Sequence, residues 1–453
     1  MKNVAPARAA AFEVLSAIER GQGRSDELLH RPAINKLSEA DRNLVTNLVM
    51  GTLRWQVALD ERIAMLLAKP KAQMDMAVRI ALRLGAFQLL YLDRIPAYAA
   101  IGESVELAKS AGDRFAAGMV NAVLRKIAAQ AKENVTVEVT NMAGLARATA
   151  HPLWMIERWT KNFGLDKTKA ICEYNQQPAP VFVRLVHAGA EEELLREGIE
   201  LAPGSFLSNV RCIIHGDITS TKAFRNGHVR IQDEGSQLVA ELAGKGSRVL
   251  DACAAPGGKT AILAERNPEA EITACDVSEK RLKEMRRIFR HVPGMAHVKY
   301  VTLDATNLNL ASEFDLILCD APCSGTGTLA RNPEIRHRLV EKELARQHTR
   351  QVRILSSLMR VVKRGGRLLY STCSLEPEEN EAVVQECLRS HPEFRPLPLE
   401  GELDRLYSAG ILQSGAAEKL TNTALMNGCL RTIPGVHTCD GFFAALLVKT
   451  VKT

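Results

Sequence analysis

Residues 248–260 read RVLDACAAPGGKT, and this stretch decides the fold of the second half of the chain. Its Val-Leu run is typical of a buried strand, Asp251 ends that strand, and the pair Gly257-Gly258 opens a turn into the helical pattern TAILAER. A strand, a tight glycine turn and a helix in this order can hold a nucleotide-like ligand at the carboxyl end of a parallel sheet. Because a glycine turn alone also serves as structural punctuation, the rest of the chain has to decide between the two readings.

From about residue 236 onward the chain alternates apolar and amphipathic segments. EFDLILCD at 313–320 and GRLLYST at 366–372 are near-continuous apolar runs, whereas LVEKELARQHTRQVRILSSLMRVVK at 339–363 has helical periodicity. Strands of this kind between amphipathic helices are covered on both faces, which is the arrangement of a parallel sheet. The pattern therefore predicts an α/β domain over residues 236–453.

The first half of the chain has a different pattern. Residues 1–135 carry apolar stripes at helical spacing, such as Ile80, Leu84 and Phe87, and no convincing strand, so we expect an all-α domain there. Residues 136–235 mix helical patterns with the β-branched segment VFVRLV, and we expect a small α+β connecting module. Three domains agree with a length of 453 residues, which exceeds what one hydrophobic core usually supports.

Composition limits the class of protein. No apolar run is long enough to span a bilayer and the first residues lack the apolar core of a signal peptide, so we expect a cytoplasmic protein without a membrane partner. The 10 cysteines all lie from Cys172 onward and match neither a disulfide scaffold nor the ligand spacing of a zinc finger, so we expect no metal. A net charge of +7 suits a polyanionic partner without requiring one.

Acidic residues end the next two predicted strands. Asp276 ends the second strand, where a carboxylate can accept hydrogen bonds from both ribose hydroxyls of a nucleoside. Asp304 ends the third strand, within reach of an adenine amino group. Either residue alone is an ordinary strand-end cap, but one glycine-rich and two acidic strand ends in order predict a nucleoside pocket. The chain has no GxxxxGK[ST] phosphate loop, which disfavours ATP as the ligand.

Two cysteines follow later strands. The fourth strand ends in Asp320-Ala-Pro-Cys323, and another ends in Ser-Thr-Cys373. Neighbouring strand ends open on one crevice, so two thiols and one carboxylate are expected to face the nucleoside pocket. A single buried cysteine is usually a small hydrophobe, whereas two of them in polar turns at strand ends favour chemistry.

A thiol suits methyl transfer to a pyrimidine. Carbon 5 of cytosine is too electron-poor to take a methyl group unaided, and a thiolate that adds to carbon 6 makes carbon 5 nucleophilic. A carboxyl group at Asp320 can hydrogen-bond cytosine N3 and the exocyclic amine, which would stabilise the adduct. Enzymes that methylate amines need acceptors for an NH2 group and no thiol.

These motifs resemble a known family. DACAAPGGKT, DAPCSGTGT and STCSLEPEENE are similar to the RNA cytosine-5 methyltransferases, and LVTNLVMGTLRW, ALRLGAFQLLYLDRIPAYAAIGESVELAK and FAAGMVNAVLRKI resemble the helical NusB family, which binds RNA. Together they make the whole chain similar to the bacterial 16S ribosomal RNA enzymes of the Sun/Fmu (RsmB) type, whose family target is cytosine 967. The resemblance implies a Rossmann-like S-adenosylmethionine-dependent methyltransferase domain after a NusB-like domain and the connecting module.

The resemblance also assigns roles to residues. It makes Cys373 the nucleophile and gives Cys323 a part in product release, a ranking that spacing alone leaves open because DNA cytosine-5 enzymes attack with the Pro-Cys thiol. It implies that the cofactor S-adenosylmethionine binds the loop residues Cys253, Ala254, Ala255, Pro256, Gly257, Gly258 and Lys259, with Asp276, Asp304 and Asp320 completing the pocket.

The partner implied by the resemblance is 16S ribosomal RNA, bound in part by the helical domain. Arg331, Arg336 and Arg338 follow the DAPC turn, and although a charge run is usually a solvated face, we expect these three to contact RNA phosphates. Two alternatives stay open. One is a DNA cytosine-5 methyltransferase, and the other is a non-catalytic RNA-binding assembly or antitermination factor.

Overall fold

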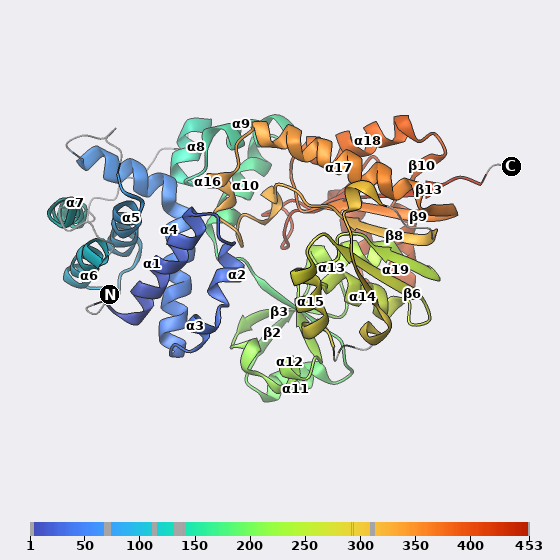
Figure 1. The fold of residues 1–453 in the computed structure, drawn as a ribbon, viewed down its shortest axis with the longest axis horizontal. Coiled ribbons are helices and arrows are strands. Elements are labelled where there is room, and N and C mark those ends of the chain that lie inside the picture. The colour runs from blue at the N-terminus through green and yellow to red at the C-terminus, as the bar shows by residue number, and fades with distance from the viewer. Residues whose placement is uncertain are drawn as a thin grey trace. The chain divides into compact units, whose positions relative to one another are not determined.

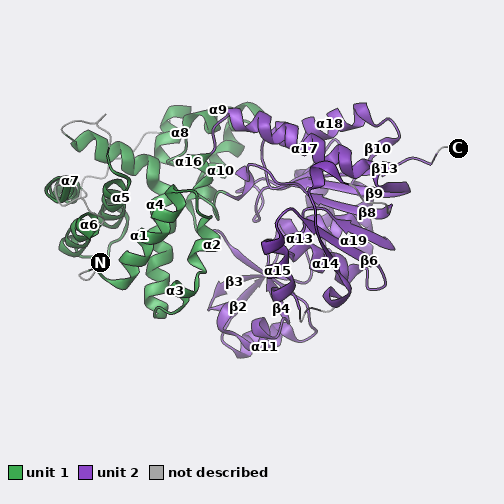
Figure 2. Cartoon of the chain, in the orientation of Figure 1, with its two compact units in different colours: residues 1–178, 329–338 green, residues 179–328, 339–453 purple. Residues whose placement is uncertain are grey.

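The computed structural model describes residues 4–67, 74–110, 116–130, 139, 141–290, 292, 294–308 and 313–451 (Figure 1). The chain divides into two compact units (Figure 2). Unit 1 comprises Met1–Pro178 with Leu329–Arg338, and unit 2 comprises Ala179–Thr328 with Leu339–Thr453. The predicted boundary between residues 135 and 136 lies outside the described residues, and the bounds of the three predicted domains stay predictions.

Every secondary-structure element among the described residues of unit 1 is a helix, which confirms the all-α domain expected near the amino end. Its core is a continuous cluster of buried side chains that includes Leu48, Leu59 and Leu82. The short α16 (Ile335–Arg338) comes from the second segment of the unit. The other helices are α1 (Pro6–Glu19), α2 (Ser25–Leu29), α3 (Pro32–Asn35), α4 (Glu39–Leu66), α5 (Met76–Tyr91), α6 (Ala97–Ser110), α7 (Ala116–Gln130), α8 (Met142–Ala148), α9 (Leu153–Phe163) and α10 (Leu165–Gln176).

The small module of unit 2 is an antiparallel sheet with short helices, as the mixed pattern predicts. Its strand order is β2-β3-β1-β4. The strand β2 was not predicted, because its sequence ELAP lacks β-branched residues. The elements are β1 (Val181–Leu185), α11 (Ala190–Arg196), β2 (Glu200–Pro203), β3 (Val210–His215), α12 (Lys222–Arg225) and β4 (Val229–Ile231).

The rest of unit 2 is a nine-stranded sheet between helices, with the order β11-β12-β13-β9-β8-β5-β6-β7 and β10 paired to β13. Its strands are β5 (Arg248–Asp251), β6 (Glu271–Asp276), β7 (Lys299–Thr302), β8 (Phe314–Asp320), β9 (Val362–Thr372), β10 (Phe394–Leu397), β11 (Leu425–Met426), β12 (Cys429–Arg431) and β13 (Phe443–Lys449). Its helices are α13 (Glu234–Ala243), α14 (Gly258–Arg266), α15 (Glu279–Ile288), α17 (Lys342–Arg360), α18 (Glu381–Ser390), α19 (Glu400–Ser408) and α20 (Ala416–Thr423).

The sheet is mixed rather than wholly parallel. Strands β7, β6, β5, β8 and β9 are parallel, as predicted, whereas β13 pairs antiparallel with β9. The sequence pattern predicted a parallel sheet within residues 236–453, and this prediction was wrong for β13. An apolar strand buried on both faces has the same pattern in either direction, so direction depends on the path of the chain before the strand.

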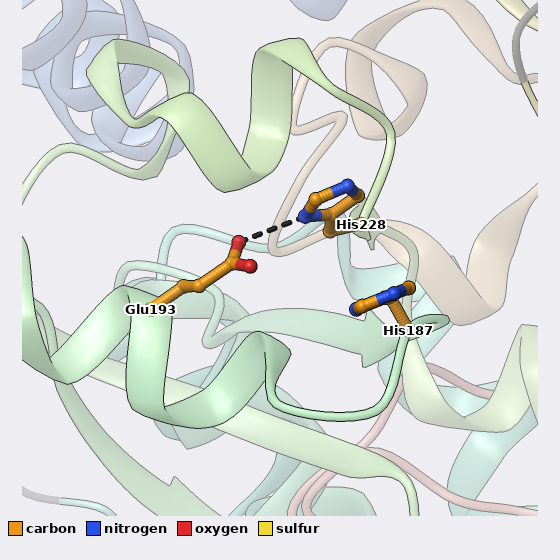
Figure 3. Close-up of side chains that lie close together, drawn as sticks. All are labelled: His187, Glu193 and His228. Atoms are coloured by element: carbon orange, nitrogen blue, oxygen red, sulfur yellow. Dashed lines mark hydrogen bonds and ion pairs between the residues drawn. The ribbon is translucent and has the colours of Figure 1, made fainter.

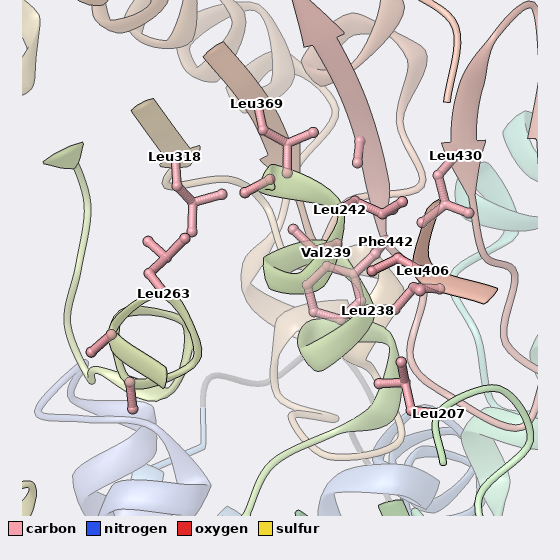
Figure 4. Packing of buried hydrophobic residues seen from close by; sticks show 14 of the residues in the cluster. Leu207, Leu238, Val239, Leu242, Leu263, Leu318, Leu369, Leu406, Leu430 and Phe442 are labelled. Carbon is pink, nitrogen blue, oxygen red and sulfur yellow. The ribbon is translucent and has the colours of Figure 1, made fainter. Parts of the chain in front are cut away.

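Both faces of the central strands are buried. Leu316 and Leu318 of β8 belong to one hydrophobic cluster, and Ile317 between them belongs to the cluster on the opposite face. Figure 4 shows Leu318 and Leu369 pointing into the cluster that also contains Leu238, Val239 and Leu242 of α13. This two-sided burial explains the near-continuous apolar runs of the sequence. None of the helices among the described residues is long and apolar enough to cross a membrane.

Candidate active site at the carboxyl ends of the parallel strands

The glycine loop between β5 and α14 is fixed against the end of β6. The backbone amide of Ala254 donates to the carbonyl of Cys275 at 2.7 Å, and the amide of Ala255 donates to Oδ2 of Asp276 at 3.3 Å. Gly257 has a φ of 115°, a backbone conformation that residues with a side chain rarely adopt. A Cβ atom there would lie 2.7 Å from Cγ of Met285. The folded loop therefore requires glycine at this position, both for its backbone conformation and for its packing.

A cavity of about 260 Å³ opens over this loop. All seven predicted loop residues, Cys253 through Lys259, line it together with Asp320, so the structure brings these predicted residues into one site. Sequence reasoning missed six lining residues: five lie in segments that fold back onto the loop, and Asp251, directly before the loop, was interpreted only as the end of the strand. They are Ile231, Gln232, Ser236, Asp251, Ile288 and Phe289.

Asp276 and Asp304 are not among the residues that line the cavity. Asp276 is buried, and its carboxylate accepts hydrogen bonds from the Ser278 amide at 2.9 Å and from the Arg281 guanidinium at 3.1 Å. Asp304 is exposed and caps a short turn by accepting from the amide of Thr306 at 2.9 Å, a hydrogen bond that lowers the pKa of its carboxyl. Their predicted contacts with ribose and adenine stay predictions.

Asp251 is a buried carboxyl group that lines the cavity. One oxygen, Oδ2, accepts a hydrogen bond from the Thr260 hydroxyl at 2.6 Å, and the other has no hydrogen-bond partner among the described residues. Burial is the main cause that raises the pKa of Asp251 from 3.8 to about 7. An unpartnered buried oxygen that lines a cavity is suited to a ligand carrying a hydrogen-bond donor or a positive charge.

The raised pKa of Asp251 predicts a pH dependence of stability. The folded protein keeps this proton up to about pH 7, whereas the carboxyl group of the unfolded chain releases it near 3.8. Folding therefore takes up a proton between these values, and the free energy of unfolding falls as the pH rises through that window. We expect this contribution to change by about 1.4 kcal/mol per pH unit and to level off above pH 7.

Asp251→Asn removes this titration while keeping an oxygen that can accept from Thr260. Thermal unfolding of both proteins at pH 5 and pH 8 measures the effect. Relative to the wild type, the variant is expected to be more stable at pH 8 than at pH 5. Parallel pH profiles for the two proteins would show that Asp251 ionises normally in the folded chain.

Lys259 and Asp320 form an ion pair inside the site. The Lys259 ammonium donates to Oδ2 of Asp320 at 2.7 Å and to the Ser236 hydroxyl at 2.9 Å, and the Ser371 hydroxyl donates to the other Asp320 oxygen at 3.0 Å. Burial favours the neutral amine, but the Asp320 carboxylate outweighs it and raises the pKa of Lys259. The predicted pocket residue Asp320 is thus fixed at the end of β8 by two donors.

The two predicted cysteines face each other. Their Sγ atoms lie 3.4 Å apart, because Cys323 follows β8 and Cys373 follows the neighbouring parallel strand β9. The contact with the Cys373 thiol, followed by burial, raises the pKa of the Cys323 thiol well above its usual value.

The backbone of Gly327 contacts the turn that carries Cys373. The amide of Gly327 donates to the Cys373 carbonyl at 2.9 Å, and a Cβ atom at Gly327 would lie 2.1 Å from the carbonyl oxygen of Gly441. Only glycine lets these three backbone segments meet. The GTGT sequence after Cys323 thereby contributes to the position of the second cysteine.

The arginine prediction needs a correction. Arg336 is buried in unit 1, where its guanidinium donates to the carbonyls of Arg54 at 3.1 Å and of Ala150 and Asn175, both at 3.3 Å. Burial lowers the pKa of Arg336 to about 9. The expectation that Arg336 contacts RNA phosphates was therefore wrong, because backbone carbonyls surround its charged group. RNA contacts by Arg331 and Arg338 stay predictions.

One group of potential metal ligands occurs among the described residues. His187, Glu193 and His228 have ligand atoms within 4.8 Å of one another (Figure 3). Nδ1 of His228 lies 2.8 Å from the Glu193 carboxylate, and this hydrogen bond lowers the pKa of Glu193. The two imidazole rings stack at 21°, so their in-plane nitrogen lone pairs do not converge on one ion. The hydrogen bond between His228 and Glu193 explains why these side chains lie close together. The expected absence of a metal stays a prediction.

Family models match three parts of the chain. Residues 241–448 match the 16S rRNA methyltransferase RsmB/F model, and residues 5–129 match the NusB family. Residues 151–207 match the ferredoxin-like domain of RsmF/B-like methyltransferases. These matches agree with the predicted helical domain, connecting module and methyltransferase domain.

Known proteins resemble the chain over nearly its whole length. A probable ribosomal RNA small subunit methyltransferase B from Bacillus subtilis is 34% identical, covering 97% of this chain and 98% of that protein. Ribosomal RNA small subunit methyltransferase B from Pseudomonas putida is also 34% identical, with 98% of each chain covered. The solved structure of a methyltransferase homolog from Pyrococcus horikoshii has a TM-score of 0.55 and 28% identity, covering 69% of this chain and 100% of that one.

Proposed function

Because this chain belongs to the RsmB/F family of 16S ribosomal RNA methyltransferases, we propose that it methylates carbon 5 of a cytosine in 16S ribosomal RNA. The family target, cytosine 967, is the base that the resemblance implies. The observation that carries the proposal is the pair of thiols 3.4 Å apart, on neighbouring strand ends beside the loop cavity. A methyltransferase that acts on an amine or a hydroxyl has no use for such a pair.

S-adenosylmethionine is the cofactor that we propose for the loop cavity. Its reactive group is a sulfonium methyl, and its amino acid part carries an ammonium group. The unpartnered oxygen of Asp251 offers an acceptor for that ammonium, and the glycine loop lets the backbone approach the nucleoside closely. The residues present therefore fit the cofactor, with Cys253 through Lys259 and Asp320 as the proposed binding residues.

Cys373 is the proposed nucleophile. Its thiolate adds to carbon 6 of the cytosine, which makes carbon 5 able to take the methyl group. Once the carbon 5 proton has left, the bond between Cys373 and carbon 6 breaks and the thiolate is restored. Lys259 lies close enough for Cys373 to contribute to its raised pKa, so its ammonium offsets negative charge that develops at the site.

Cys323 is the proposed base for product release. The contact with the Cys373 thiol is the first cause of its raised pKa. When the Cys373 sulfur is bonded to carbon 6, it carries neither a proton nor a charge, so that cause is removed. In its thiolate form, Cys323 accepts the proton from carbon 5 and becomes a thiol. Asp320 is proposed to accept a hydrogen bond from the cytosine amine, in addition to its two partners in the chain.

Ribosomal RNA is the proposed partner, and the cytoplasm is the proposed location. The NusB-like helical domain, Arg331 and Arg338 are proposed to contribute RNA contacts, which would make binding weaken as salt rises. A base inside a duplex cannot reach the thiols, so the target cytosine has to be unstacked or single-stranded.

Transfer from labelled S-adenosylmethionine to unmodified 16S ribosomal RNA tests the proposal. Parallel reactions contain small-subunit particles, transfer RNA or duplex DNA, and mapping then locates the labelled base. Label at carbon 5 of one cytosine in ribosomal RNA is the expected result. Label confined to DNA would support the DNA methyltransferase alternative, and a chain that binds no S-adenosylmethionine in isothermal titration would support the non-catalytic one.

A further inference from the structure

Glu379 is a buried carboxylate that the proposed reaction does not use. It ends the short turn Pro377–Glu379, and its side chain is 0% exposed. Its Oε1 accepts from the amide of Ser324 at 2.8 Å and from the Gln351 side chain at 3.0 Å. Its Oε2 accepts from the hydroxyls of Ser324 and Ser374. Four neutral donors thus fill the four acceptor positions of the carboxylate.

The two serines place this carboxylate between the cysteine turns. Ser324 directly follows Cys323, and Ser374 directly follows Cys373. Each turn therefore donates to the same buried group from the residue next to its thiol. Hydrogen bonds to an ionised acceptor are stronger than neutral ones, so this connection is stiffer than a contact between two serine hydroxyls.

Glu379 is itself fixed by the strand that carries Cys373. The Tyr370 hydroxyl donates to the Glu379 carbonyl at 2.7 Å. The next residue, Asn380, accepts from the Thr372 hydroxyl at 2.5 Å and donates to the Ser374 carbonyl at 2.8 Å. The carboxylate therefore has little freedom to follow the Cys323 turn if that turn moves, and it holds the turn in place.

We propose that Glu379 is a positioning residue, which holds the Cys323 and Cys373 turns in register so that both thiols reach one base. The catalytic consequence rests on the proposed function, since attack at carbon 6 and proton removal at carbon 5 involve adjacent atoms of one ring. The geometric consequence does not: the 3.4 Å separation of the sulfurs depends on Glu379 whether or not a base is bound.

Thiol oxidation measures that geometry without RNA or cofactor. Diamide oxidises two thiols to a disulfide and takes up both hydrogens as it is reduced to a hydrazine, and mass spectrometry of the digested full chain then quantifies the Cys323–Cys373 link. In Glu379→Gln, the amide turns an NH2 group toward donors of the two turns, so we expect the linking rate to fall about tenfold, equivalent to about 1.4 kcal/mol. Glu378→Gln, one residue earlier in the same turn, is the matched control and is expected to link at the wild-type rate.

Enzyme kinetics then separate positioning from binding. We expect the kcat of Glu379→Gln to fall on the order of 10²-fold, as for a misplacement of about 1 Å, with an unchanged dissociation constant for S-adenosylmethionine. Equal linking rates in Glu379→Gln and the wild type would overturn the proposal. If Glu379→Gln does not fold, Ser324→Ala and Ser374→Ala each remove one donor and are expected to slow linking by a smaller factor. A wild type that links rapidly but transfers no methyl group would contradict the proposed function alone.

Discussion

Cys373→Ala is expected to abolish methyl transfer, with a loss on the order of 10⁴-fold or more, because no other group in the site replaces a covalent nucleophile. Without the sulfur, carbon 5 of the cytosine stays too electron-poor to take the methyl group. Cys373 does not line the loop cavity, so the dissociation constant for S-adenosylmethionine is expected to stay close to the wild-type value.

Labelled transfer and isothermal titration on the same preparations provide the two measurements. Cys212→Ser is the matched control, since it changes a half-buried thiol of the small module and should leave both values unchanged. Full activity in Cys373→Ala would show that the nucleophile is assigned to the wrong residue. Loss of cofactor binding would instead indicate a folding defect around β9.

Cys323→Ala is expected to trap the enzyme on its RNA. The Cys373 adduct can still form and take the methyl group, but the base that removes the carbon 5 proton is gone, so the bond to carbon 6 persists. We expect a covalent protein–RNA complex that survives denaturing electrophoresis, with turnover reduced to about one methyl group per enzyme.

The double variant Cys323→Ala, Cys373→Ala decides whether the trapped bond runs through Cys373. It is expected to form no stable complex, because the bonding sulfur is absent. A complex that accumulates in Cys373→Ala instead would exchange the two roles, which is the order found in DNA cytosine-5 enzymes. Because the sulfurs lie 3.4 Å apart, either cysteine can reach the base, so the comparison of these variants decides which one is the nucleophile.

The glycine loop and the cysteine pair could be predicted from the sequence because their signals are local. The apolar run before Asp251, the glycines at 257 and 258 and the cysteines at two strand ends are each read within about ten residues. The rule that parallel strands end at one edge then places Cys323 and Cys373 together, and the structure finds them in contact. The same rule correctly includes Asp320 in the cavity.

Other features depend on segments that meet only in the folded chain. Arg336 has the composition of an exposed basic stretch, yet carbonyls from three distant segments enclose it. The direction of β13 follows from the path of the preceding chain, which leaves no trace in an apolar pattern. Glu379 and Glu378 are indistinguishable as letters, and only the folded turn directs the Glu379 carboxylate between two serines that lie 50 residues apart.

By itself, the sequence determined the helical and α/β periodicities, the glycine loop and the residue types that the proposed chemistry requires. The tertiary structure alone decided which charges are buried, which oxygen of Asp251 is left without a partner, and how two thiols 50 residues apart come into contact. The physical reason is that periodicity and turn chemistry act between near neighbours in the chain, whereas burial and hydrogen-bond satisfaction depend on distant segments packing together.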